Sequence, residues 1–367
     1  MSEPFIASQT HKAGETGETD ETRARNEYPV RAIGDVWLPV ATAQGSGSVP
    51  MFVGGCAKPA RATRALIVLH GRLRDADAYL HSTLRARAAS SAHDDGTLVV
   101  VPQFLASADV EHHHTQAAQA AQADCLHWEW TAWMGGFDAR GPAPLSSFDV
   151  LDALVEQLAD RARYPALREI VIAGHSGGAQ VAHRHAILSG APERCAQRGV
   201  AVRFVIANPS SYVYFDSLRP QPDGVFRPTD FAACPDVDDW KYGMRKLPRY
   251  AAASHDAAAF ERRYVEREVV YLAGSRDCDA AHPALDRSCA ANAQGPHRLA
   301  RARAYYAYLR ARHPHLRHQW HEVPDAGHDA QAMFLSAAGL RALFGAQATI
   351  DAARAAQMHP AEGGASD

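Results

Sequence analysis

Residues 169–178 have the sequence EIVIAGHSGG. The first five form a short, mostly apolar run, which is typical of a strand buried on both faces of a parallel sheet. A turn with three glycines follows, and residues 177–188 then have helical character. This succession predicts a strand, a sharp turn and a helix, with Ser176 at the tip of the turn.

The residues on both sides of this unit alternate between apolar runs of strand length and stretches of helical spacing. Further strands are predicted at residues 65–70, 97–104, 202–207, 269–273 and 318–323, and a hairpin at residues 36–40 and 51–54. Helices are predicted at residues 75–88, 147–162, 299–312 and 329–344, the second with Ser147 as its N-cap. Such alternation is typical of βαβ crossovers. We therefore predict an α/β fold, with a mostly parallel central sheet that carries helices on both faces.

The chain divides into a core, an insertion and two tails. Residues 31–211 and 268–345 carry the strand and helix signals and form the predicted core. Residues 212–267 interrupt the pattern with many Pro, Asp and aromatic residues, and they predict a folded lid over the carboxyl edge of the sheet. Residues 1–30 are polar and predict a disordered tail, while residues 346–367 predict the end of the last helix and a small polar tail.

The composition is that of an ordinary globular protein. The chain has 367 residues, of which 47% are apolar and 22% charged, with a net charge of −3 at neutral pH. This balance gives no indication of nucleic-acid binding. No apolar run approaches the roughly 18 residues of a membrane-spanning helix, so no membrane association is expected.

The N-terminus and the cysteines bear on the compartment. Residues 1–19 carry charges and lack the apolar segment of a secretory signal, so a cytoplasmic protein with reduced thiols is expected. The six cysteines form no CxxC pair and show no zinc spacing. Cys278 and Cys289 lie in one Asp- and Pro-containing loop, and they could pair if the protein met an oxidising compartment.

The GHSGG turn predicts a nucleophilic serine. In a G-x-S-x-G sequence between a strand and a helix, a strained turn projects the serine hydroxyl above the sheet. Side chains two residues before and after the serine would collide there, so Gly174 and Gly178 suit the turn. The helix N-terminus points at the hydroxyl, and the amide of Gly177 can donate to an oxyanion that develops on a substrate.

With these residues the chain resembles the α/β-hydrolase superfamily of serine hydrolases, over roughly residues 35–345. The resemblance implies a second oxyanion donor just beyond a His-Gly pair that follows an early strand. The sequence His70-Gly71-Arg72 is similar. The backbone amide of Arg72 is therefore the expected donor, and His70 is interpreted as a structural residue of the loop.

The resemblance also implies a catalytic triad in the order Ser, acid, His. Among the late histidines, only His328 lies just past the last predicted strand, in a Gly-His pair like that of the family, and it is the expected base. The sequence GSRD at residues 274–277 resembles the turn that carries the acid. Asp277 is the expected acid, with Asp279 as the alternative, and its role would be to hold the tautomer of the histidine.

Three aromatic residues are candidates for substrate contacts. Trp130 and Trp133 follow the predicted strand at 97–104, and Tyr212 follows the strand at 202–207. Because loops at the carboxyl ends of parallel strands meet at one edge of the sheet, these rings could line the substrate space, although packing in the core would explain them equally well.

No cofactor or metal is expected. The sequence has no Walker loop, no GxGxxG and no HExxH motif, and the histidines at 112–114 are interpreted as a solvated loop. We therefore predict a cofactor-free serine hydrolase that cleaves a small-molecule carboxylic ester through an acyl-enzyme, with no indication of its oligomeric state. The alternatives are cleavage of an amide or peptide bond by the same residues, and a hydrolase-like protein that binds without catalysis.

Overall fold

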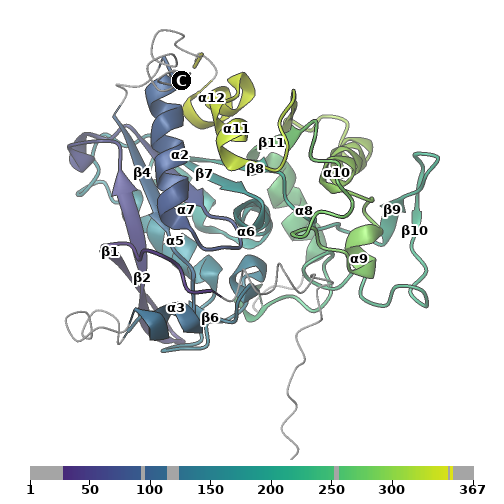
Figure 1. The fold of residues 1–367 in the computed structure, drawn as a ribbon, viewed down its shortest axis with the longest axis horizontal. Coiled ribbons are helices and arrows are strands. Elements are labelled where there is room, and N and C mark those ends of the chain that lie inside the picture. The colour runs from purple at the N-terminus through teal and green to yellow at the C-terminus, as the bar shows by residue number, and fades with distance from the viewer. Residues whose placement is uncertain (1–27, 92–95, 114–123, 252–255, 346–347, 350–367) are drawn as a thin grey trace, which may run out of the picture.

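The computed structural model describes residues 28–91, 96–113, 124–251, 256–345 and 348–349. Its centre is a sheet with the strand order β1-β2-β4-β3-β7-β8-β11-β12 (Figure 1). β1 and β2 form an antiparallel hairpin, β2 is antiparallel to β4, and the other neighbours run parallel. The strands span Val36–Thr42 (β1), Gly45–Gly54 (β2), Arg64–Leu69 (β3), Thr97–Pro102 (β4), Glu169–His175 (β7), Ala201–Ala207 (β8), Glu268–Gly274 (β11) and Gln319–Val323 (β12).

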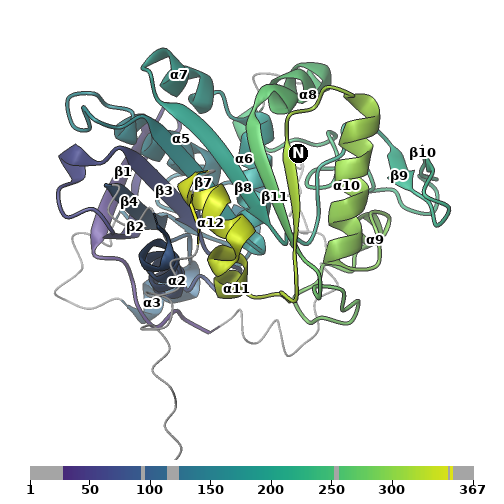
Figure 2. The ribbon, with the colours of Figure 1, turned by 90° about the horizontal axis from the view of Figure 1, so that it is seen from above.

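Helices cover both faces of this sheet, as Figure 2 shows from above. α2, α11 and α12 contribute to the core on one face, and α5, α6, α7, α8 and α10 to the core on the other. The helices span Ala76–Ala89 (α2), Ser107–His112 (α3), Ser147–Leu158 (α5), Gly177–Leu188 (α6), Ala191–Gln197 (α7), Ala257–Glu266 (α8), Cys289–Asn292 (α9), Arg298–Arg312 (α10), Ala330–Leu335 (α11) and Ala337–Phe344 (α12).

The third strand shows why its sequence is apolar throughout. Ala65, Ile67 and Leu69 of β3 belong to the core under α6, while Leu66 and Val68 belong to the core under α2. All five are fully buried. Because successive side chains of a strand point to opposite faces, a strand covered by helices on both sides needs apolar residues at every position. The predicted fold class is confirmed.

The predicted strands and the hairpin are all present with somewhat different ends, but two helix predictions were wrong in detail. α5 is capped by Ser146 rather than Ser147, because Ser146 Oγ accepts the backbone N–H of Phe148 at 3.0 Å. The stretch expected to form one last helix is interrupted at Ser336, which is extended (φ −63°, ψ 156°). Its hydroxyl accepts the N–H of Gly339 at 2.9 Å and so begins α12 as a separate helix.

The segment 212–267, predicted to be a lid, contains little regular structure. It includes the short strands Leu218–Pro220 (β9) and Phe226–Pro228 (β10), the 3-10 turn Arg249–Ala251 (η3), and α8. The remaining short elements are Pro59–Arg61 (η1), Leu105–Ala106 (β5), His127–Trp128 (β6) and Ala132–Gly135 (η2). The predicted tails lie almost entirely outside the described residues. Within the described part of the chain, no helix has both the length and the apolarity to cross a bilayer.

Candidate active site

Ser176 lies in the sharp turn between β7 and α6 with a backbone conformation that side chains rarely adopt. Its φ is +56° and its ψ is −117°. A Cβ built on Gly174 would overlap the backbone of Gly178, and one built on Gly178 would overlap the carbonyl of Leu69 in β3. The glycines are therefore required, since the turn folds back on itself and packs directly against the neighbouring strand.

Three side chains that are far apart in the sequence are hydrogen-bonded in series at this turn. His328 Nε2 lies 2.9 Å from Ser176 Oγ, and His328 Nδ1 lies 2.8 Å from Asp277 Oδ2. Asp277 follows β11, and His328 follows β12. Because β7, β8, β11 and β12 are consecutive parallel neighbours in the sheet, their carboxyl ends bring these loops together.

The geometry distinguishes between the two candidate acids. Asp277 is 3% exposed and bonds the imidazole, whereas Asp279 is exposed and its carboxylate accepts the backbone N–H of Ala281. The second oxygen of Asp277 faces Arg298, the first residue of α10, with Nη1 at 3.4 Å from Oδ1. Arg298 is fully buried and also donates from Nη2 to the carbonyl of Ala284 at 2.7 Å. Sequence reasoning missed Arg298, because nothing in the sequence distinguishes it from the many other arginines.

The surroundings keep the acid ionised and the base neutral. Burial would raise the pKa of Asp277, but the hydrogen bond to His328 and the charges of His328 and Arg298 hold it below its ordinary value. Burial lowers the pKa of His328, and the charge of Arg298 lowers it further, against the opposing effect of Asp277. His328 is therefore a neutral imidazole at neutral pH, which can accept a proton from the serine hydroxyl.

Two other imidazoles lie against His328. The ring centroids of His175 and His282 are 4.6 Å and 5.0 Å from that of His328. His282 Nδ1 accepts the backbone N–H of Ala284 at 3.0 Å, so the neutral ring carries its proton on Nε2. Burial lowers the pKa of His282 to about 4 and that of His175 well below its ordinary value. Neither ring adds a positive charge beside His328 at neutral pH.

The two backbone amides expected to face an oxyanion are neighbours. A Cβ built on Gly177 would lie 3.1 Å from the backbone nitrogen of Arg72. His70, two residues before Arg72, is fully buried and bridges two backbone groups: its Nδ1–H donates to the carbonyl of Gly71 at 2.8 Å, and its Nε2 accepts the N–H of Phe104 at 3.0 Å. Since the Gly71 carbonyl and the Arg72 amide belong to one peptide unit, His70 fixes the direction of that N–H.

Solved structures of known proteins have the same arrangement of a mostly parallel sheet between two layers of helices. The poly(aspartic acid) hydrolase-1 from Sphingomonas sp. KT-1 is 23% identical, with a TM-score of 0.52, over 82% of this chain and 96% of that one. The poly(3-hydroxybutyrate) depolymerase from Bordetella parapertussis is 22% identical, with a TM-score of 0.56, over 89% and 96%. The chain has the α/β-hydrolase fold. No protein-family model and no curated protein sequence matches it.

Two cavities of very different size meet at the serine of this α/β-hydrolase fold. The wide cavity has a volume of about 550 Å³, and a second cavity at the serine, here called the slot, has a volume of about 20 Å³. Ser176 and Arg72 line both. His328 lines only the wide cavity, and Gly177 lines only the slot.

The three aromatic residues predicted to contact substrate line neither cavity. Trp133 is fully buried, and its ring stacks on Phe104 with centroids 5.3 Å apart. Tyr212 is 1% exposed and stacks on Tyr305 at 4.6 Å. Trp130 is half-buried, and the Arg74 guanidinium lies over its ring. The prediction of substrate contacts was wrong for Trp133 and Tyr212, because both rings are buried in the core, and it stays a prediction for Trp130.

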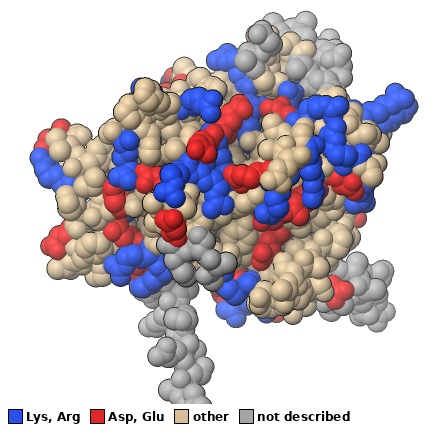
Figure 3. Space-filling model, turned by 180° about the vertical axis from the view of Figure 1, so that it is seen from behind, with Lys and Arg blue, Asp and Glu red and all other residues tan. Residues whose placement is uncertain are grey.

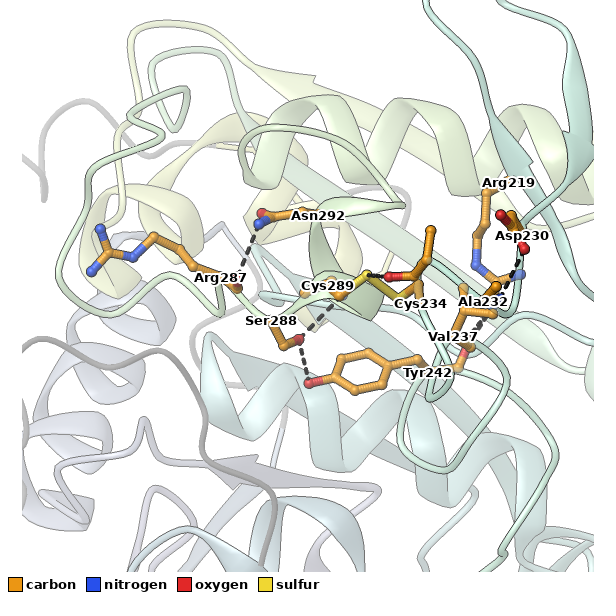
Figure 4. The surroundings of a disulfide bond; sticks show 12 residues. Arg219, Asp230, Ala232, Cys234, Val237, Tyr242, Arg287, Ser288, Cys289 and Asn292 are labelled. Atoms are coloured by element: carbon orange, nitrogen blue, oxygen red, sulfur yellow. Dashed lines mark hydrogen bonds between the residues drawn. A yellow bond between two sulfur atoms is a disulfide. The ribbon is translucent and has the colours of Figure 1, made fainter.

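The structure contains a disulfide, although the sequence led us to expect reduced thiols (Figure 4). Cys234 of the insertion is bonded to Cys289 at the start of α9, whereas Cys278 is an exposed thiol. Beside the disulfide, Ser288 Oγ donates to the Tyr242 hydroxyl at 2.9 Å, as Figure 4 shows. The sequence left open a pairing of Cys278 with Cys289, which the structure does not contain. The partner of Cys289 lies 55 residues away in sequence, within the insertion, and no sequence spacing indicates it.

We looked for charged patches on one face of the molecule and for metal-binding groups among the described residues. On the face shown in Figure 3, Lys and Arg side chains are interspersed with Asp and Glu. Among the residues that the structure describes, no group of three His, Cys, Asp or Glu side chains is placed to hold a metal ion.

Proposed function

We propose that this protein is a serine hydrolase that cleaves carboxylic esters through an acyl-enzyme. The observation that carries the proposal is the series of hydrogen bonds from Ser176 Oγ to His328 Nε2, at 2.9 Å, and from His328 Nδ1 to Asp277 Oδ2, at 2.8 Å. A serine hydroxyl is a weak nucleophile until a base removes its proton, and a base needs a third group to fix its tautomer. This arrangement supplies both.

The chemistry proceeds in two half-reactions. Ser176 Oγ forms a bond to the ester carbonyl carbon, and its proton passes to His328 Nε2. The carbonyl oxygen becomes an oxyanion, which accepts the N–H groups of Gly177 and Arg72. The bond from carbon to the alcohol oxygen then breaks, and His328 returns the proton to that oxygen. Water repeats these steps on the acyl-enzyme, which releases the carboxylic acid and restores the serine hydroxyl.

Asp277 has a purely electrostatic and positioning role in this scheme. Its pKa lies below the ordinary value, because the hydrogen bond to His328 and the charges of His328 and Arg298 outweigh its burial, so it is ionised at neutral pH. It stabilises the imidazolium that forms during each half-reaction and holds Nε2 toward the serine. It does not accept the proton.

A fluorophosphonate probe tests the proposal directly. We expect one covalent adduct on Ser176 and turnover of p-nitrophenyl acetate, with both lost in Ser176→Ala. A native protein that neither reacts with the probe nor hydrolyses the ester would instead favour the binding protein without catalysis. Turnover of a matched p-nitroanilide at the rate of the ester would favour cleavage of amide bonds.

The compartment expected from the sequence stays a prediction. Disulfides persist mainly in oxidising compartments, and the bond between Cys234 and Cys289 therefore weighs against the cytoplasm.

A further inference from the structure

The two cavities at Ser176 are not equivalent for the two halves of an ester. During acylation, the oxygen of the leaving alcohol must lie within hydrogen-bond reach of His328, because His328 returns the proton to it. Of the two cavities, only the wide one is lined by His328. The alcohol half of the ester therefore extends into the wide cavity, and the acyl half, attached to the same carbon, extends into the slot beside Gly177.

The slot limits the acyl half to a very small group. Its volume of about 20 Å³ is little more than the 10–15 Å³ that one water molecule needs. Met134 and Leu285 are buried walls of the slot, and the ion pair between Lys241 and Asp286, whose Nζ and Oδ2 are 3.5 Å apart, forms another part of its wall. A longer alkyl chain would have to displace packed side chains or contact this ion pair.

The wide cavity is large and polar. A volume of about 550 Å³ is within the range of sites that hold whole small molecules. Hydrogen-bonding side chains are distributed over its wall, from α2, from the loop after β11 and from the start of α11: Asp75, Ser82, His282, Asp329 and Gln331. Such a lining offers many hydrogen-bond donors and acceptors, which suits an alcohol with several hydroxyl groups.

We propose that the protein cleaves esters of an acyl group about the size of acetyl with a bulky, polyhydroxylated alcohol. This proposal rests on the proposed ester hydrolysis and adds which half of the substrate occupies which cavity. The alcohol occupies the wide cavity, and the small acyl group occupies the slot, which also contains the oxyanion donors Gly177 and Arg72.

A pair of isomeric esters tests the size assignment. Benzyl acetate has a small acyl group and a large alcohol, and methyl phenylacetate has the reverse, while both have unactivated alkyl leaving groups. We expect kcat/KM for benzyl acetate to be higher by about 100-fold, since one misplaced methylene already costs about 10- to 200-fold. Equal rates, or a preference for methyl phenylacetate, would overturn the assignment.

A variant of the slot checks that its walls cause the preference. Leu285→Ala should raise kcat/KM for methyl phenylacetate relative to benzyl acetate by about 10-fold. Leu309→Ala truncates a buried leucine of α10 outside both cavities, and it should leave the ratio unchanged. A ratio that changes equally in both variants would contradict a role for the slot.

A second pair tests the polarity of the alcohol site. The 6-O-acetyl ester of methyl glucoside and cyclohexylmethyl acetate have a six-membered ring in the same place, with and without hydroxyls. We expect KM to be about 10-fold lower for the glucoside, the effect of one or two hydrogen bonds. A lower KM for the cyclohexyl ester would overturn the polar half of the proposal. Failure of all four esters, together with no fluorophosphonate adduct, would overturn the proposed function itself.

Discussion

The turn at Ser176 and the segment 212–251 both reach the slot, but different kinds of contact hold them. The turn is held by its own glycines and by the strand beside it. The segment is held by residues far away in sequence: Trp240 Nε1 donates to the carbonyl of Gly135 at 2.6 Å, Arg249 pairs with Asp138 at 2.8 Å, and a disulfide closes the segment onto α9. The comparison teaches that the chemistry depends on a local motif, whereas the shape of the site depends on distant partners.

We expect the largest effect on activity from a change in the hydrogen-bonded series of Ser176, His328 and Asp277. Asp277→Asn leaves the imidazole in the wrong tautomer, so kcat for p-nitrophenyl acetate should fall by about 10⁴-fold. Asp279→Asn is the matched control, because this exposed carboxylate does not contact His328, and its activity should stay within about twofold. A larger loss in Asp279→Asn than in Asp277→Asn would reverse the assignment of the acid.

The disulfide should affect stability rather than chemistry. Replacing Cys234 and Cys289 by serine should lower the free energy of unfolding by about 4 kcal/mol, since the bond closes a loop of 55 residues. Urea unfolding measures the change, with Cys278→Ser as the control at an exposed thiol. The fluorophosphonate adduct on Ser176 should persist in the double variant. Loss of the adduct at full stability would mean that the segment supports the chemistry directly.

Both regions also depend on buried neutral histidines. His70 orients the loop before Arg72, and His183 Nε2 accepts the backbone N–H of Val213 at 3.0 Å, where the segment begins. Burial lowers the pKa of His70 to about 4 and that of His183 well below its ordinary value. A histidine in the unfolded chain takes up a proton near pH 6.5, whereas these two stay neutral in the folded protein. Their contribution to the free energy of unfolding is therefore complete above pH 6.5 and is lost as the pH falls below it.

His70 alone should account for about 2 kcal/mol of the stability lost between pH 7 and pH 5. Urea midpoints at the two pH values measure the loss. His70→Asn should be less stable at pH 7 but should lose about 2 kcal/mol less on acidification. An unchanged pH dependence in His70→Asn would contradict the low pKa.

The buried Arg298 should influence the pH profile more than the maximal rate. His328 is surrounded by Asp277, Arg298, Arg72 and the rings of His175 and His282, and the net effect lowers its pKa. The acid limb of kcat/KM should therefore lie below pH 6.5, with activity rising as His328 loses its proton.

In Arg298→Gln a positive charge that lowers the pKa of His328 is removed, so the acid limb should move to higher pH, and kcat/KM at pH 6 should fall more than kcat/KM at pH 8. Arg303→Gln, at an exposed position of α10, should keep the native profile. If Arg298 had only a structural role, Arg298→Gln would reduce kcat/KM at every pH without moving the acid limb of the pH profile.

The smallest effect is expected at Trp240. Trp240→Phe removes the bond to the carbonyl of Gly135 and should cost about 1 kcal/mol of unfolding free energy. The preference for benzyl acetate over methyl phenylacetate should be unchanged as long as the neighbouring Lys241 keeps its place in the wall of the slot. A lower ratio of kcat/KM for benzyl acetate to kcat/KM for methyl phenylacetate would show that the bond from Trp240 to Gly135 sets the shape of the slot.

Much of the fold followed from the sequence because its signals are local. Apolar runs predicted the strands of the parallel sheet, and the glycines around Ser176 predicted the turn. Asp277 and His328 were expected from their places after the last two strands, and the structure brings both to the serine. The predicted substrate contacts of Trp133 and Tyr212 failed, since an aromatic residue near the right edge can equally pack in the core, as Trp133 does.

The sequence by itself determined the order of layers and the turn that carries the serine, because strand burial and a glycine turn depend on neighbouring residues. Only the tertiary structure decided that Arg298 faces the acid, that Cys234 bonds Cys289, and that a wide cavity and a narrow slot meet at one hydroxyl. These features arise where segments distant in sequence pack together. Their packing depends on both partners at once, so neither segment alone predicts it.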